Sequence, residues 1–151
     1  MKILMIIALV LITLVAVAFG YIYWQNSQVP TLGHNSGQLT PLSGNPNGVS
    51  TQTDDGEKAV DPWPFKADRA ATMQAIKDAL AAHGGAEVVR EEEDYLRVVF
   101  VTPKMRFRDD AEFYLDETTR QVHFRSESRA GKSDLGLNRQ RHEQLTTLYA
   151  R

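Results

Sequence analysis

The chain has 151 residues, which is the length of one domain of ordinary size with an added segment. Seventeen Lys and Arg stand against nineteen Asp and Glu, a net charge of −2, and this excludes a general nucleic-acid binder, which needs a basic excess. The absence of Cys excludes disulfides, thiol nucleophiles, iron–sulfur clusters and Cys-based zinc sites.

Residues 1–24 predict a membrane anchor. The run from residue 3 to residue 24 is apolar almost throughout, and its 22 residues match the roughly 20 helical residues that span a hydrocarbon core. Tyr21, Tyr23 and Trp24 gather at one end of the run, where an interfacial aromatic belt lies in membrane proteins. We therefore expect a transmembrane helix, with the lipid bilayer as the partner of residues 3–24.

The basic residues predict how this helix is oriented. Lys2 precedes it, and the next basic residue is Lys58, so the positive-inside rule keeps the N-terminus in the cytoplasm and the remainder in the periplasm. A cleaved secretory signal ending near Ala16-Val17-Ala18 is the alternative, but the apolar run continues past that point. A buried core helix is disfavoured because the run has no wet face. We expect a single-pass protein of the cell inner membrane.

Residues 25–44 predict a flexible tether. The stretch from Gln25 to Asn47 is rich in Asn, Ser, Gly, Pro and Gln, a composition that buries too little surface to offset the entropy of ordering. A segment that docks on a partner and folds there is the alternative. Composition alone begins the extracytoplasmic domain at Pro62, and a resemblance given below moves its start earlier, so that residues 45–151 are assigned to this domain.

The domain carries one clear helix and four strand-like runs. Asp68 is a predicted N-cap for a helix over residues 69–83, whose apolar residues recur at spacings of three and four and which Gly84 and Gly85 end. Residues alternate between apolar and polar along the four runs that follow, which is typical of an antiparallel sheet with one wet face. These runs cover residues 86–92, 95–102, 108–116 and 120–129.

A second helix is predicted over residues 134–149, capped by Ser133 or Asp134. The order of elements gives an α+β fold, a four-stranded antiparallel sheet flanked by two helices and preceded by a single N-terminal transmembrane helix.

The hairpin of the third and fourth runs carries the candidate binding residues. A two-residue loop places Phe113 opposite Phe124 and Glu112 opposite Arg125, whereas a four-residue loop places Asp110 opposite Arg125. The pairs form either an exposed ion-pair ladder or a cleft whose guanidiniums bind a carboxylate or phosphate, close to the N-terminus of the last helix. The candidate ligand-binding residues are Arg125, Arg129, Glu112 and Arg139.

No catalytic residue, cofactor or metal ligand is predicted. Gly131-Lys132-Ser133 resembles the end of a phosphate-binding loop, but Ser126 stands where that loop needs Gly. His142-Glu143 begins like a zinc-protease helix, but Thr146 replaces the second His. His123 is interpreted as an exposed strand residue and not as a base.

Charge is segregated along the chain. Residues 54–94 hold eleven acids and five bases, whereas residues 97–151 hold eight acids and eleven bases. The two halves either pair electrostatically or leave a basic face for anionic lipid headgroups.

The C-terminal half resembles an uncharacterised bacterial family, domain of unknown function 1499, which is also seen in photosynthetic lineages. The resemblance lies in Asp109-Asp110-Ala111-Glu112-Phe113 and in the run from Arg125 to Arg141, which match D-D-x-E-F and R-S-x-S-R-x-G-x-S-D-x-G-x-N-R-x-R. Residues 46–50 resemble the P-N-x-V-S opening, where many members carry Cys and this chain has Gly48. The resemblance covers about residues 45–149 and implies a membrane-tethered extracytoplasmic module, with no established activity.

The interpretation that follows is a binding or interaction module of the cell envelope whose partner is an envelope protein or an anionic small molecule. The alternatives are an envelope hydrolase with an unassigned polar site on the outer face of the sheet and a structural subunit of a membrane complex.

Overall fold

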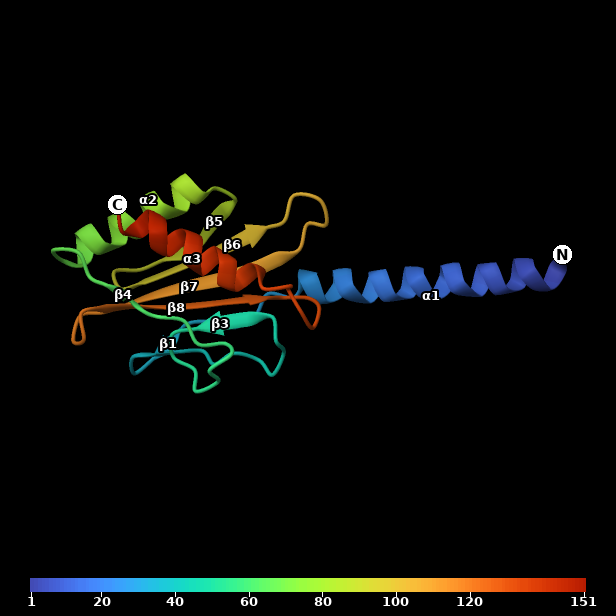
Figure 1. The fold of residues 1–151 in the computed structure, drawn as a ribbon, viewed down its shortest axis with the longest axis horizontal. Helices are drawn as coiled ribbons and strands as arrows, with labels where there is room; N and C mark the ends of the chain where they lie inside the picture. Colours follow the sequence, from blue (N-terminus) through green and yellow to red (C-terminus); the bar gives the residue numbers. More distant parts are fainter.

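A computed structural model describes residues 1–151. Helix α1 (Lys2–Ser27) projects from one end of a domain that the rest of the chain forms (Figure 1). It is long and apolar enough to cross a membrane, and its apolar span is not buried against the domain. The expected N-terminal apolar helix is thus present, and it is separate from the core.

The main sheet has six strands, not the four that we predicted. The four predicted runs form an antiparallel meander, and two short strands from earlier in the chain both pair with its last strand, so that the order is β3-β8-β7-β6-β5 with β4 also on β8. The α+β class and the antiparallel pairing are confirmed. The strands are β3 (Gly48–Ser50), β4 (Trp63–Pro64), β5 (Ala86–Glu91), β6 (Tyr95–Val101), β7 (Arg108–Asp116) and β8 (Gln121–Ser128).

The two added strands escaped prediction because they are too short to show alternation. Gly48 and Pro64 are also residue types that strands disfavour. Gly48 is needed where it stands, since a Cβ there would lie 2.9 Å from the Ser126 carbonyl oxygen and 2.9 Å from Leu42. The close approach of β3 to β8 therefore depends on this glycine.

The β7–β8 hairpin adopts the register predicted for a two-residue loop, although the observed turn has four residues. Phe113 pairs with Phe124, and Glu112 pairs with Arg125. The ladder ends at Asp116 and Gln121, so residues 117–120 form the turn. Asp116 ends the ladder because its carboxylate accepts hydrogen bonds from Thr118 and Thr119 within the turn.

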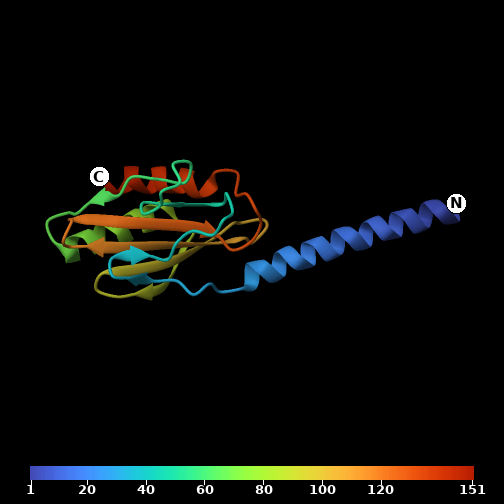
Figure 2. The same ribbon diagram turned by 90° about the horizontal axis from the view of Figure 1, so that it is seen from below.

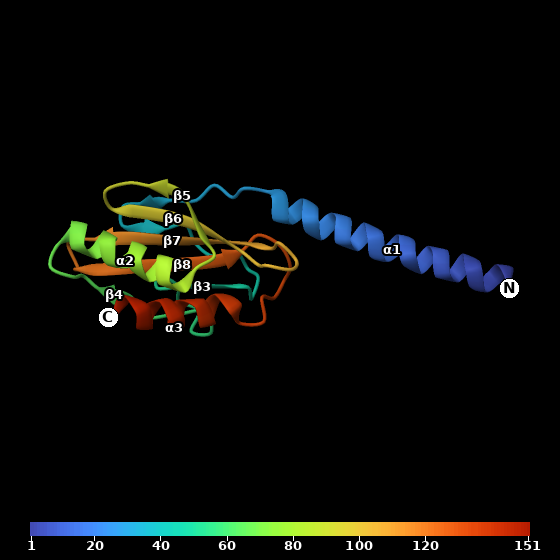
Figure 3. The same cartoon turned by 90° about the horizontal axis from the view of Figure 1, so that it is seen from above.

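Helices α2 (Arg69–His83) and α3 (Leu137–Tyr149) cover one face of the sheet (Figure 3). The Asp68 carboxylate accepts a hydrogen bond from the Ala71 amide at 2.8 Å, and this confirms the predicted cap of α2. Helix α3 begins three residues later than predicted, because Leu135 and Gly136 both have positive φ angles. The core between the helices and the sheet is apolar and includes Trp63, Ile76, Phe113, Phe124 and Leu145.

The opposite face of the sheet is covered by the segment that we expected to be a flexible tether. Strands β1 (His34–Asn35) and β2 (Gln38–Leu39) form a small hairpin that lies on this face (Figure 2). Leu32 and Leu39 are buried, and the ring of His34 stacks on Tyr114 with centroids 4.3 Å apart. We call residues 28–45 the covering segment. Leu32 and Leu39 are the buried apolar anchors of this segment. The average composition of the stretch does not reveal that these two residues are buried. The boundaries at residues 24 and 44 stay a prediction.

Candidate functional site

The residues of the family motif divide between the two faces of the sheet. Successive strand residues point to opposite faces, so Asp109 and Ser126 point toward α3 whereas Asp110 and Arg125 point toward the covering segment. The run R-S-x-S-R therefore supplies two separate clusters, one on each face.

The cluster beneath α3 is buried, and its side chains are extensively hydrogen-bonded. Arg141 donates to Asp109 Oδ2 at 2.6 Å, and both Arg141 and Ser126 donate to Asn138 Oδ1. The Asn138 amide nitrogen donates in turn to the Asn47 carbonyl at 2.9 Å. This network binds α3, β8 and β3 together, and no nucleophile in it faces a base. We therefore interpret this cluster as one that stabilises the packing of α3 on the sheet.

The cluster beneath the covering segment is ionic. We call it the outer-face cluster: three guanidiniums and three carboxylates, which are Arg97, Arg125, Arg129, Asp110, Glu112 and Glu127. Asp110 lies between two of the guanidiniums, at 2.6 Å from both Arg97 and Arg129. The Asp110 and Glu112 side chains are 1% and 0% exposed, so the exposed ladder considered from the sequence is wrong. The covering segment is the reason, since it shields this face from water.

Arg125 has an uneven set of partners. Its guanidinium lies 2.5 Å from Glu127 Oε2 and 3.4 Å from Glu112 Oε2, while its Nε and that Glu112 oxygen, both buried, have no hydrogen-bond partner. Burial raises the pKa of the Glu112 carboxyl above its usual range, although the Tyr95 hydroxyl, which donates to it at 2.6 Å, and Arg125 lower that pKa. The pair is thus the least satisfied part of the outer-face cluster.

A polar pocket of about 230 Å³ opens beside this cluster. Its floor comes from the ends of β7 and β8, and its rim comes from the last turn of α1 and from the covering segment. None of its lining residues is hydrophobic. The lining residues are Gln25, Gln28, Pro30, Ser43, Asn45, Asp110, Arg125, Glu127, Ser128 and Arg129. We call this the α1-end pocket.

The structure brings together three of the four predicted binding residues. Arg125 and Arg129 line the α1-end pocket, and Glu112 lies directly behind Arg125. Arg139 lies on the other side of the sheet, where it donates to the carbonyls of Glu57 and Ala59 at 2.7 and 3.1 Å and so holds that loop. Arg139 belongs to α3, which covers the face of the sheet opposite the outer-face cluster, and this accounts for the separation. The ligand-binding role of these residues stays a prediction.

Sequence reasoning missed Asp110, Glu127 and Arg97 as members of the site. Asp110 and Glu127 lie opposite each other in the observed register, which was one of the two predicted. Arg97 points from the neighbouring strand β6 toward the same face of the sheet. Strict alternation along three strands would have gathered all three on one face. The sequence does not indicate that Gln25 and Ser43 line the pocket, because their position there depends on where the covering segment lies.

A second polar pocket of about 530 Å³ contains a hydroxyl, an imidazole and a carboxylate. Thr51 Oγ1 lies 3.2 Å from His123 Nδ1, and His123 Nε2 lies 4.0 Å from Asp116 Oδ2. Burial lowers the pKa of the His123 imidazole, so it is neutral at pH 7. The predicted exposure of His123 is wrong, since 12% of its side chain is exposed.

One group of side chains has the composition of a metal site. His34 of the covering segment meets Glu92 and Asp94 of the β5–β6 turn, with ligand atoms within 4.8 Å of one another. Arg90 already binds the Glu92 carboxylate at 2.6 Å, so a cation at this place competes with a guanidinium.

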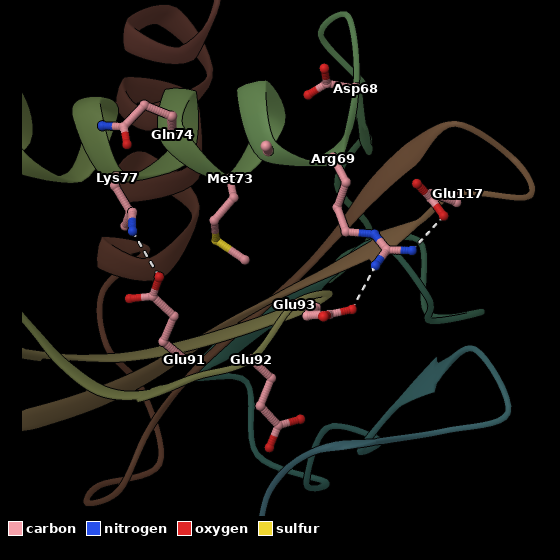
Figure 4. Close-up of a pocket in the computed structure, with 10 residues that line it drawn as sticks. Asp68, Arg69, Met73, Gln74, Lys77, Glu91, Glu92, Glu93 and Glu117 are labelled. Atoms are coloured by element: carbon pink, nitrogen blue, oxygen red, sulfur yellow. Dashed lines mark hydrogen bonds and ion pairs between the residues drawn. The ribbon is translucent and has the colours of Figure 1, made fainter.

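An open surface groove of about 910 Å³ lies between α2 and the β5–β6 turn. Figure 4 shows that its charged side chains are already paired: Lys77 with Glu91, and Arg69 with both Glu93 and Glu117. Met73 lies at its base. The groove is open and acidic, and the one unpartnered donor in its lining, Arg69 Nε, is buried.

The fold and the site define a small α+β domain with an ionic cluster enclosed between its sheet and an N-terminal segment. The chain belongs to the family described as protein of unknown function (DUF1499), whose model matches residues 38–148. This confirms the resemblance found in the sequence. The match begins in β2, so the end of the covering segment belongs to the family's domain. Neither curated proteins nor solved structures gave a match.

Proposed function

We propose that this protein is a binding module of the cell envelope, anchored in the inner membrane by α1 with its N-terminus in the cytoplasm and its domain in the periplasm. The length and composition of α1 support the anchor, and the position of Lys2 ahead of the apolar run supports the orientation. The ligand site in this proposal is the α1-end pocket.

The observation that carries the binding role is Arg125. Its side chain is 4% exposed, it lines the pocket, and its Nε has no hydrogen-bond partner although a buried donor without one is costly. Arg129 lines the same pocket. Guanidiniums bind carboxylate and phosphate groups through paired N–H donors, so a ligand with either group satisfies this site.

The size and charge of the pocket restrict the ligand further. A volume of about 230 Å³ lies below the range of about 300–1,000 Å³ typical of drug-sized ligands, and no hydrophobic residue lines the pocket. Asp110 and Glu127 balance the two guanidiniums. A small polar compound that carries an anionic group together with ammonium or hydroxyl donors therefore matches the lining best.

The test is ligand-induced thermal stabilisation of the full chain in detergent micelles. The probes are inorganic phosphate, glycerol phosphate and phosphoethanolamine. At least one probe is expected to raise the Tm of the wild-type protein and of Arg139→Ala, which removes a guanidinium outside the pocket. The same probe is expected not to change the Tm of Asn45→Trp, because this substitution fills the pocket rim without removing a charge. If no probe shifts the wild-type Tm, or if Asn45→Trp responds equally, the pocket is not the binding site.

A hydrolase is the second candidate, and the observation that favours it is the Thr51–His123–Asp116 arrangement. Two contacts weaken it: the Thr51 hydroxyl accepts the Phe124 amide at 3.0 Å, and Asp116 is occupied by the β7–β8 turn. This function predicts that the full chain hydrolyses model esters or phosphoesters and that His123→Ala abolishes the rate. Equal rates of hydrolysis for the wild-type chain and His123→Ala would contradict the hydrolase function.

A further inference from the structure

Two loops lie at the end of the domain from which α1 projects. Residues 102–107 join β6 to β7, and residues 129–136 join β8 to α3, and Figures 1 and 3 both show these loops beside the C-terminal end of α1. We call this the α1 end of the domain. The turns at residues 92–94 and 117–120 lie at the opposite end, which we call the far end.

Asn26 fixes the first of these loops to α1. Its side chain is buried, its amide nitrogen donates to the Arg106 carbonyl at 2.9 Å, and its oxygen accepts the Arg108 amide at 2.7 Å. The ring of Tyr23 lies 6.3 Å from that of Phe107. The loop is therefore level with the aromatic residues that end the apolar run of α1, where a bilayer surface would lie.

Both loops expose apolar side chains. Leu135 is 96% exposed and Met105 is 38% exposed, and neither belongs to the core. Leu135 also has a φ angle of 55°, a backbone conformation that branched side chains rarely adopt. Transfer of this exposed side chain from water to an apolar environment would be favourable.

The exposed charges of the two loops are basic. Lys104, Arg106 and Lys132 are exposed, and none of them lies within 4.0 Å of a carboxylate. Of the acids at this end, Asp109 and Asp110 are buried and paired beneath the surface, and the half-buried Asp134 accepts hydrogen bonds from the Gly136 and Asn138 amides. The α1 end thus combines apolar tips with unpaired cations.

The far end has the opposite charge. Glu91, Glu92, Glu93 and Glu117 gather there around the groove of Figure 4. The domain is therefore polarised along the direction of α1, and an anionic surface attracts its α1 end while it repels the far end. This explains in three dimensions the charge segregation seen along the sequence.

We propose that the α1 end is a second membrane contact, in which Leu135 and Met105 enter the interface of the bilayer and Lys104, Arg106 and Lys132 bind the phosphates of anionic lipids. This inference rests on the proposed anchoring of α1. Apolar tips beside basic residues bind anionic interfaces by burial and by charge together. The contact holds the α1-end pocket at the level of the lipid headgroups.

The test uses the fact that the chain has no Cys. Single variants Ser133→Cys, Thr118→Cys and Leu14→Cys of the full chain carry an environment-sensitive fluorophore in vesicles of phosphatidylcholine with or without phosphatidylglycerol. Ser133 lies in the exposed loop beside Leu135, Thr118 lies at the far end, and Leu14 lies within α1. Lipids with a shallow spin label measure contact of residues 133 and 118 with the membrane surface, and lipids with a deep spin label measure insertion of residue 14.

Quenching at residue 133 is expected to exceed that at residue 118 by about twofold or more in vesicles that contain phosphatidylglycerol. It is expected to fall toward the value at residue 118 in Leu135→Asp and in the Lys104→Glu, Lys132→Glu double variant, each made in the Ser133→Cys chain. Equal quenching at 133 and 118, with strong quenching at residue 14, would overturn the second contact alone. Loss of quenching at residue 14 would overturn the anchoring as well.

Discussion

At the residue scale, the stability of the domain depends on buried charges that have partners. Asp109 and Arg141 are 2% and 5% exposed and lie 2.6 Å apart. A buried pair of this kind adds little over an apolar pair, but the loss of one partner leaves the other charge buried and uncompensated. The position of the pair beneath α3 makes the docking of that helix sensitive to either residue.

The first prediction concerns this pair. Asp109→Ala is expected to lower the free energy of unfolding by about 3–5 kcal/mol, because Arg141 loses its only carboxylate. Lys77→Ala, which breaks the exposed pair with Glu91, is the control and is expected to cost no more than about 1 kcal/mol. Urea unfolding of the full chain in micelles, followed by the fluorescence of buried Trp63, measures both. Equal costs would contradict the structural role of the cluster.

The second prediction concerns pH. Burial lowers the pKa of the His142 imidazole, which stacks on Trp63 with centroids 5.7 Å apart. A lowered folded-state pKa gives stability that is present above the unfolded value near 6.5 and is lost as the pH falls. Between about pH 7 and pH 5, the wild-type domain is expected to lose more stability than His142→Gln. His123 titrates with the same sign in both proteins.

Urea unfolding at the two pH values measures this difference. An equal loss of stability in the wild type and in His142→Gln would contradict the lowered pKa of His142 in the folded state.

The candidate site was partly predictable at this scale. Arg125 and Arg129 were predicted because alternation along β8 fixes which residues share a face. Arg139 was wrongly grouped with them because the sequence does not show which face of the sheet α3 covers, and α3 packs on the face opposite Arg125 and Arg129. The burial of the charges was not predictable, since the covering segment that shields them looked like free chain.

At the scale of elements, strong periodicity predicted well and short pieces did not. The helix over residues 69–83 and the strand over residues 108–116 have the predicted bounds, because caps and alternation mark their ends. Strands β3 and β4 have three and two residues, and only their pairing with β8 defines them. The covering segment is likewise defined by what it touches, and composition cannot report such contacts.

The third prediction concerns the covering segment. Leu39→Ala is expected to lower the free energy of unfolding by about 2 kcal/mol or more and to expose the outer-face cluster to solvent, because Leu39 is one of two apolar anchors. Val29→Ala, at an exposed position, is expected to change it by less than about 0.5 kcal/mol. Hydrogen exchange of the β7 amides reports the exposure. Unchanged exchange would mean that the segment does not shield the sheet.

At the scale of the whole molecule, α1 and the domain form a polarised unit. Asn26 couples the last turn of α1 to the loop before β7, and the covering segment then carries the chain across the sheet. This arrangement leaves no long free linker between the apolar helix and the domain. The α1-end pocket and the basic loops consequently lie at the same level, beside the predicted membrane surface.

The central claim is that α1 spans the inner membrane and leaves the domain in the periplasm, and one measurement tests it most directly. Alkaline phosphatase, which becomes active only outside the cytoplasm, and β-galactosidase, which is active only inside it, are each fused after Arg151 in a bacterial host. The account predicts an active phosphatase fusion and an inactive galactosidase fusion, both in the membrane fraction. An active galactosidase fusion with an inactive phosphatase fusion would contradict it.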